Sequence, residues 1–175
     1  RDRAVLERAL QIANYLQDSK EGLVIATALS DTVPAQSGVW YQTAYHALRE
    51  QDADRAINAL SRLLDLDPEA ELEALFLSAY PATPEGRTRM IEAIGGLESR
   101  HPGNGHLQFA RALLAGENGA YAEAITHIRQ ARSRMPDSIP ALLLHARLLG
   151  MNHQESEALD LLSDAVMKYP NSRQV

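Results

Sequence analysis

Residues 39–68 read VWYQTAYHALREQDADRAINALSRLLDLDP and carry two apolar faces on either side of the polar break REQDAD. The first face contains Trp40, Ala44 and Ala47, whose spacing places them along one side of an α-helix. The second face follows the break, at positions 56, 60, 63 and 64. The stretch therefore predicts two helices joined by a turn, with a proline closing the second helix.

That proline is one of five that recur every thirty-four residues: Pro34, Pro68, Pro102, Pro136 and Pro170. Proline cannot donate a backbone hydrogen bond and disfavours helix in the residue before it, so each one ends a helix at the same length. The last interval repeats the plan, with apolar positions at 142, 146 and 149 and then at 158, 162 and 165. We expect repeats that end near these five prolines, and about ten helices in five antiparallel pairs.

Small residues recur where two helices of a pair should cross. Close approach needs a small side chain on one side, and a bulky residue one turn later fills the groove beside it. The pairs at these positions are Ala56 with Leu60, Ala124 with Ile128, and Ala158 with Leu162. The first and third repeats depart from this rule. In the first, Gly22 is at the small position and Ala26 at the filling position, and in the third Met90, Ile94 and Leu97 replace the usual set.

Capping residues predict several helix ends. Thr83 can cap a helix whose first residue is Pro84, and Ser138 can cap another. Gly150 is expected to end the helix after Ser138 in a left-handed conformation.

In the fourth repeat a turn about two residues longer than standard would place Phe109 in the core, whereas the standard register would turn it to the groove.

Composition excludes several functions. The formal charge of −6 and the pI near 5.5 argue against nucleic-acid binding, which needs a basic face. No apolar run reaches the roughly 18 residues that span a membrane, and no signal-peptide pattern opens the chain. The chain has no cysteine, which excludes disulfides and thiolate metal sites.

The periodicity resembles the tetratricopeptide repeat, a thirty-four-residue unit with the pattern W-x2-L-G-x2-Y, then A-x3-F, then P. The second repeat matches with Trp40, Thr43, Ala44 and Ala47, followed by Ala56, Leu60, Leu63 and Pro68. The resemblance covers nearly the whole chain. It implies one all-α solenoid over residues 1–175, a right-handed superhelix of helix pairs that binds a protein or peptide on its concave face.

The family's groove positions, carried over to this sequence, give candidate partner-binding residues. They are Tyr41, Tyr45 and Arg49 in the second repeat, Leu75 and Ala79 in the third, Arg111 in the fourth on the longer turn, and Leu143 and Arg147 in the fifth. Tyrosine offers contact area at low entropic cost, and arginine offers a fork to carboxylates. An ordinary solvated or half-buried position is the competing interpretation of each. The Lys and Asn clamp of the chaperone-binding members is missing, so binding to chaperone tails is not expected.

The sequence gives little indication of a metal-binding or catalytic site. The six histidines lack metal-ligand spacing, and the acidic run 65–73 lacks the central glycine of a calcium loop. Arg129, Arg132 and Arg134 form a basic face that could meet acidic segments or simply face solvent. With no phosphate loop and no nucleophile elbow, we expect neither an enzyme nor a metal or other cofactor.

From the chain ends we expect a fragment of a longer protein; the alternative is self-association through uncapped repeats. Leu159, Leu162 and Val166 lie on helix faces that a neighbour should cover, and NSRQV after Pro170 would open another repeat. The opening DRAVLERALQIANYL also resembles repeats of proteobacterial outer-membrane lipoprotein adaptors. This resemblance implies a periplasmic or outer-membrane-associated location and a regulatory adaptor role for a protease; the alternative location is the cytoplasm.

Overall fold

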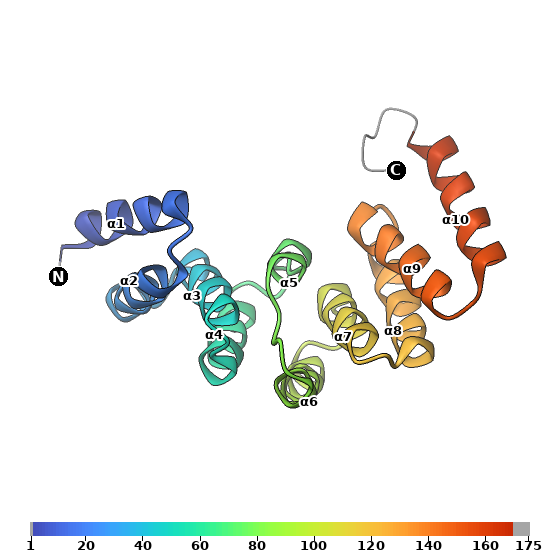
Figure 1. The fold of residues 1–175 in the computed structure, drawn as a ribbon. Helices are drawn as coiled ribbons and strands as arrows, with labels where there is room; N and C mark the ends of the chain where they lie inside the picture. The colour runs from blue at the N-terminus through green and yellow to red at the C-terminus, as the bar shows by residue number, and fades with distance from the viewer. Residues whose placement is uncertain (1, 170–175) are drawn as a thin grey trace. The chain divides into compact units, whose positions relative to one another are not determined.

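The computed structural model describes residues 2–169, which form α-helices joined by short connections, with no strand among them (Figure 1). The helices of this part of the chain are α1 (Arg3–Leu16), α2 (Ser19–Thr32), α3 (Ser37–Arg49), α4 (Ala53–Leu66), α5 (Glu73–Ser78), α6 (Pro84–Arg100), α7 (Gly105–Glu117), α8 (Tyr121–Arg134), α9 (Ile139–Met151) and α10 (Glu155–Lys168). The predicted all-α fold of ten helices is confirmed. Pro170 and NSRQV lie outside the described residues.

These helices belong to two compact units. The N-terminal unit comprises the described residues up to Ala70 together with Leu77–Leu97, and the C-terminal unit comprises Glu71–Phe76 together with the described residues from Glu98 on. Each unit has its own helix pairs.

In the N-terminal unit α1 packs on α2, α2 on α3, and α3 on α4. The predicted small residues are at the contacts: Ala44, Ala47 and Ala56 have no exposed surface. Leu60 beside Ala56 is 1% exposed, as expected of a side chain that fills the groove. Asp18 and Asp52 cap α2 and α4, each accepting a hydrogen bond from a backbone N–H three residues on.

The turn inside each regular helix pair follows the same thirty-four-residue period. A residue with positive φ occupies it at Gln17, Gln51, Gly119 and His153. The next N–H in each case bonds to the carbonyl five residues back, for example Asp18 to Ala13 and Gln154 to Leu149, which is the Schellman arrangement. The expectation of a left-handed Gly150 was wrong, because α9 continues through it and His153 takes that conformation.

The third repeat is irregular. Its first helix, α5, has only six residues, and prolines at 81 and 84 follow it closely. The predicted cap of α6 is confirmed, since the Thr83 hydroxyl accepts a hydrogen bond from the Gly86 N–H at 3.1 Å. Met90, Ile94 and Leu97 are buried along α6, so this helix has an apolar face.

In the C-terminal unit α7 packs on α8, α8 on α9, and α9 on α10, with a further contact between α7 and α9. Phe109 and Ala110 are fully buried and Leu113 is 2% exposed, so Phe109 lies in the core. The expected longer turn was wrong, because α7 begins and ends 68 residues after α3 and 34 residues before α9, which is the standard register. The Ser138 hydroxyl accepts a hydrogen bond from the Ala141 N–H at 3.3 Å and so caps α9 as predicted.

Candidate protein-binding surfaces

The N-terminal unit brings three predicted residues together on successive turns of α3. Tyr41 and Tyr45 are half-buried and Arg49 is exposed. The Arg49 guanidinium lies 5.7 Å from the centre of the Tyr45 ring and donates to its hydroxyl at 3.4 Å. Its Nε also donates to the Ser19 hydroxyl of α2 at 2.7 Å. We call Tyr41, Tyr45 and Arg49 the α3 row.

Polar residues that the sequence did not single out support this row from α1. Asn14 donates through Nδ2 to the Gln42 Oε1 at 3.1 Å and accepts at Oδ1 from the His46 Nε2 at 2.9 Å. Burial and the nearby Arg49 lower the pKa of His46, so its imidazole is neutral near pH 7. The sequence carries no signal for this network beyond separations close to one repeat, 28 and 32 residues.

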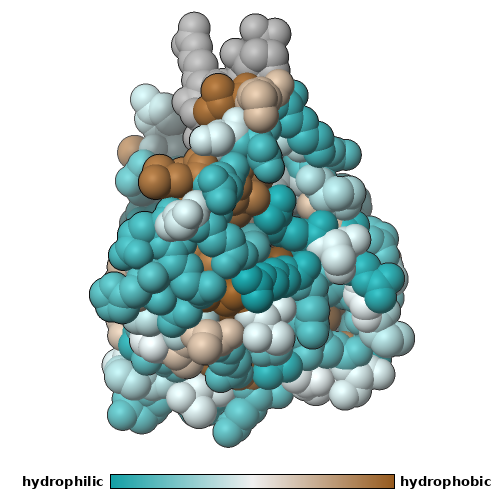
Figure 2. Space-filling view, turned by 90° about the vertical axis from the view of Figure 1, so that its right-hand side faces the viewer, coloured by the Kyte–Doolittle hydropathy of each residue, from teal (hydrophilic) through white to brown (hydrophobic). Residues whose placement is uncertain are grey.

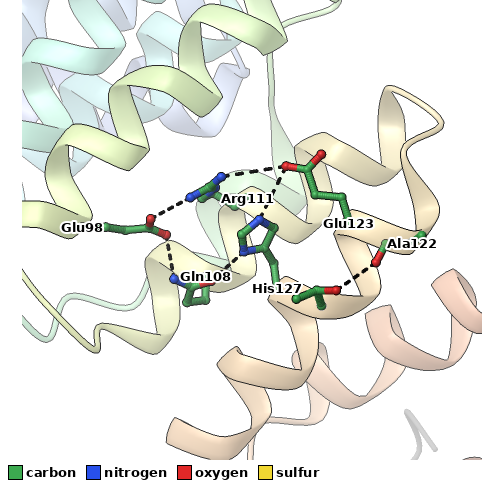
Figure 3. A network of polar contacts seen from close by, with 7 residues as sticks. Glu98, Gln108, Arg111, Ala122, Glu123 and His127 are labelled. Atoms are coloured by element: carbon green, nitrogen blue, oxygen red, sulfur yellow. Dashed lines mark hydrogen bonds and ion pairs between the residues drawn. The ribbon is translucent and has the colours of Figure 1, made fainter.

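Arg111 in the C-terminal unit is engaged within the protein (Figure 3). Its Nη1 donates to the Glu98 Oε2 at 2.9 Å, and its Nη2 lies 3.8 Å from the Glu123 Oε1. The Glu98 carboxylate also accepts from Gln108 at 2.8 Å. The Arg111 side chain is 24% exposed. Arg111 therefore joins the last turn of α6 to α7 and α8, and it offers little surface to a partner.

His127 completes this network from α8. Its Nδ1 lies 2.8 Å from the Gln108 Oε1, and its Nε2 lies 3.6 Å from the Glu123 Oε1. Burial and the Arg111 charge lower the pKa of His127, although Glu123 and Glu98 oppose them. The neutral ring donates from Nδ1 to Gln108, so the network orients its members through hydrogen bonds.

Arg147 remains accessible. Its side chain is 59% exposed and its Nη2 donates to the Glu117 Oε1 of α7 at 2.7 Å. It lines a pocket of about 140 Å³ between α7, α8 and α9, together with Leu113, Gly116, Glu117, Tyr121, Leu144, Leu148 and Met151. The pocket therefore combines the Arg147–Glu117 ion pair with apolar walls, and it lies between α7 and α9, the first helices of two neighbouring repeats.

The structure departs from the sequence-based candidates in the third repeat. Leu75 is fully buried and presents no surface to a partner. Ala79 follows the end of α5 instead of lying on a helix. Both differences arise because α5 is too short to display groove positions as a regular first helix would.

The basic face expected on α8 is occupied by contacts with the following pair. Arg129 donates to the Glu157 carboxylate at 2.7 Å. Arg132 donates through Nη1 to the His145 Nδ1 at 2.9 Å. These two arginines connect α8 to α10 and α9 through hydrogen bonds, and they do not form a common anion site.

Apolar side chains remain exposed on the first and last helices. On α10 Leu159, Val166 and Met167 are 65%, 54% and 74% exposed, at spacings that place them along one side. Figure 2 looks onto the side where α9 and α10 lie and shows brown apolar atoms between teal polar ones. On α1 the exposed set is Val5, Ile12, Tyr15 and Leu16.

Within residues 2–169 the His, Asp and Glu side chains form no group of three that could hold a metal ion. Among the helices of the same range, none combines the length and apolarity that a membrane crossing requires.

Comparisons with known proteins agree with the helix pairs. The tetratricopeptide repeat family model matches residues 115–175. The TPR repeat-containing protein PA4667 of Pseudomonas aeruginosa is 28% identical over 175 residues, which is 100% of this chain and 30% of that protein. The chain thus spans about a third of the length of this curated relative.

Solved structures show the same fold at low identity. MamA of Desulfovibrio magneticus RS-1, solved from residue 41 to its end, has a TM-score of 0.56 at 13% identity, covering 99% of this chain and 97% of the solved one. YrrB, described as a TPR protein with an unusual peptide-binding site, has a TM-score of 0.51 at 10% identity, covering 94% and 85%. The family model and the Pseudomonas relative support tetratricopeptide repeats in this chain, and the solved structures share its fold.

Proposed function

We propose that this chain is a non-enzymatic scaffold that binds a protein or peptide through the first helices of its repeats. The α3 row is the observation that carries the proposal. It presents two half-buried tyrosines and an exposed arginine on consecutive turns, which is the composition of protein-binding hot spots. Proteins of this repeat family are generally interaction modules, and YrrB, which shares the fold, has a peptide-binding site.

Arg147 is the second contact that we assign, because it is exposed beside a small apolar pocket. Leu75 and Arg111 are left out of the proposed surface, since one is buried and the other is held by two carboxylates. We also propose an adaptor role in the bacterial envelope, which rests only on the resemblance of the opening sequence to the repeats of outer-membrane lipoprotein adaptors.

A triple variant tests the proposal: Tyr41→Ala, Tyr45→Ala and Arg147→Ala. A photo-crosslinking amino acid in place of the exposed Gly38, one turn before Tyr41, would first capture partners from a bacterial extract. The purified partner would then be titrated by calorimetry. We expect the triple variant to bind at least about tenfold more weakly, because aromatic and arginine anchors contribute most of the energy of such interfaces. Circular dichroism should show unchanged helical content.

A matched control changes three exposed residues on second helices: Asn58→Ala, Glu92→Ala and Gln130→Ala. This variant should bind like the wild type. The proposal fails if the triple variant keeps full affinity, or if the control loses as much as the triple variant does.

Self-association is the second candidate function, favoured by the exposed apolar side of α10. Replacing Leu159 and Met167 with lysine would place charges on that side without touching the core, because both side chains are exposed. Light scattering over a concentration series should then show association in the wild type and its loss in the variant. A wild type that stays monomeric at high concentration rules this function out.

A further inference from the structure

A pocket of about 530 Å³ lies in the C-terminal unit, and its lining includes neither Arg147 nor any residue of the α3 row. The starts of α5, α7 and α9 and the turn before α9 enclose it, and its size falls in the range of ligand pockets, roughly 300–1,000 Å³. Its walls are mostly apolar and include Ala74, Met135, Pro136, Ile139 and Pro140. Its charged lining residues are Glu71, Glu73 and Asp137, with His106 beside them.

Glu73 is a buried carboxylate in this lining, 8% exposed. Its Oε2 lies 2.8 Å from the His106 Nδ1, and its Oε1 accepts from the Ser138 hydroxyl at 3.3 Å. Burial raises the pKa of Glu73, but the hydrogen bonds from His106, from its own backbone and from Ser138 together lower it below its usual value. The group is therefore negative at neutral pH, and a carboxylate with about four acceptor positions can take further donors.

Asp137, an exposed residue of the lining, already binds an ammonium group of the same chain. Lys168 of α10 donates to its Oδ1 at 2.8 Å, and the Tyr169 hydroxyl donates to the same oxygen at 3.2 Å. The Lys168 and Asp137 side chains are 53% and 80% exposed, so water screens their attraction. A cation from a partner could replace Lys168 at little cost.

We propose that this pocket holds a lysine or arginine side chain of the protein partner. The aliphatic stem would lie along Ile139, Pro140 and the other apolar walls, as the stems of these residues commonly do. The charged end would meet the carboxylates, which together outnumber Lys168 three to one. This charge balance repels anions and selects a basic segment of the partner. The inference rests on the proposed function, because it names the chemistry of the partner.

The test uses the complete 175-residue chain and three small probes, each acetylated on its α-amino group and methylamidated at its carboxyl group. They are the derivatives of lysine and arginine, which keep their charged side chains, and the neutral derivative of norleucine. Titrations would be followed by the backbone amide signals of the protein in NMR. We expect either basic probe to shift the amides of Ala74, His106 and Ile139, and norleucine to bind about tenfold more weakly, since hydrogen bonds to charged groups are the stronger ones. Equal affinity for norleucine overturns the proposal.

A double variant, Glu73→Gln with Asp137→Asn, removes both charges and keeps the carbonyl acceptors for His106, Ser138 and Lys168. It should bind the basic probes about tenfold more weakly, whereas Glu92→Gln on α6, a control for overall charge, should bind them like the wild type. Lys168→Ala should tighten binding, because it removes the internal competitor. A double variant that keeps wild-type affinity overturns the proposal.

The captured partner separates this inference from the proposed function. If partner binding is lost in the α3 row and Arg147 triple variant but survives in the Glu73 and Asp137 double variant, the pocket inference fails and the proposed function stands. If binding is lost in the double variant but survives in the triple variant, the basic-segment pocket stands and the first-helix surface fails.

Discussion

The imidazole of His46 on α3 fills the space beside Gly22 on α2 that any side chain at residue 22 would need. A Cβ added to Gly22 would come within 2.3 Å of the ring. His46 is 1% exposed and hydrogen-bonded to Asn14, so the ring has no room to turn away. Gly22 therefore allows α2 and α3 to approach with a histidine between them.

Gly22→Ala should destabilise the protein. Alanine is better than glycine inside a helix by about 0.5–1 kcal/mol, but overpacking a filled interface costs about 1–3 kcal/mol. The second effect is larger, so the free energy of unfolding measured in urea should fall by about 1 kcal/mol or more.

Gly96→Ala provides the matched control in the same unit. Gly96 lies inside α6, and an added Cβ meets no atom within 4 Å. The same substitution should there raise the free energy of unfolding, by up to about 1 kcal/mol. A Gly22 variant as stable as the Gly96 variant would show that the contact with His46 is not tight.

His153→Gly should stabilise the protein. His153 has φ of 58° and a side chain that is 92% exposed, so its left-handed conformation is costly for a residue with a Cβ. Glycine should raise the free energy of unfolding by about 0.5–1 kcal/mol in a urea titration.

Gln51→Gly at the equivalent turn is expected to act in the opposite direction. Gln51 has the same left-handed backbone, but its side chain accepts from the Ala82 N–H at 2.6 Å and donates to the Tyr80 carbonyl at 3.3 Å. Glycine would remove both of these bonds and a third, which the Gln51 Nε2 donates to the Leu48 carbonyl at 2.9 Å. The free energy of unfolding should therefore fall. Equal stabilisation by the two variants would mean that the Gln51 side chain contributes nothing.

His145 should make stability depend on pH. Burial and the positive charges of Arg132 and Arg129 lower its pKa to about 4. Between about pH 6.5 and 4 the unfolded chain therefore binds a proton that the folded protein does not. The free energy of unfolding should fall as the pH is lowered through this range, by about 2–3 kcal/mol in total from this residue.

Urea titrations at several pH values check this dependence. His145→Gln keeps an acceptor for Arg132 and removes the titrating ring, so its curve should be flatter below pH 6.5. As a control, Gly96→Ala changes no titratable group, so its curve should run parallel to that of the wild type. If the His145 variant retains the wild-type slope, acid loss of stability comes from other groups.

The core and helix positions were predictable because they depend on local periodicity. Ala56 and Leu60 are buried where the spacing places them. The turn at His153 was not predictable from residue type, since glycine is the usual residue with this conformation and Gly150 lies three positions earlier. What fixes the turn is its backbone hydrogen bonding, which repeats with the thirty-four-residue period whatever side chain is present.

The candidate surface was predictable only in regular repeats. Tyr41, Tyr45 and Arg49 share one side of α3 because their spacing is four residues, a property of the helix alone. Leu75 is buried and Arg111 is engaged with Glu98 for reasons that a single helix does not contain. They depend on the short α5 and on the contact of the last turn of α6 with α7.

Arg111 should matter more for stability than for binding. Glu98→Ala would leave its guanidinium three-quarters buried without its main partner. Breaking a fully buried pair costs about 3–5 kcal/mol, and the partial exposure here should reduce the loss to about 1–3 kcal/mol. Chemical denaturation should show this decrease, while affinity for the captured partner should change less than in the Arg147→Ala variant.

The exposed pair of Arg89 and Asp54 in the N-terminal unit is the appropriate comparison. Their side chains are 57% and 77% exposed, so Asp54→Ala should cost less than about 1 kcal/mol. The double variant of Glu98 and Arg111, both to alanine, should be more stable than the sum of the single changes predicts, because the lone charge is gone. Additive losses would mean that the two groups act independently, and Arg111 would again be a candidate for contact with the partner.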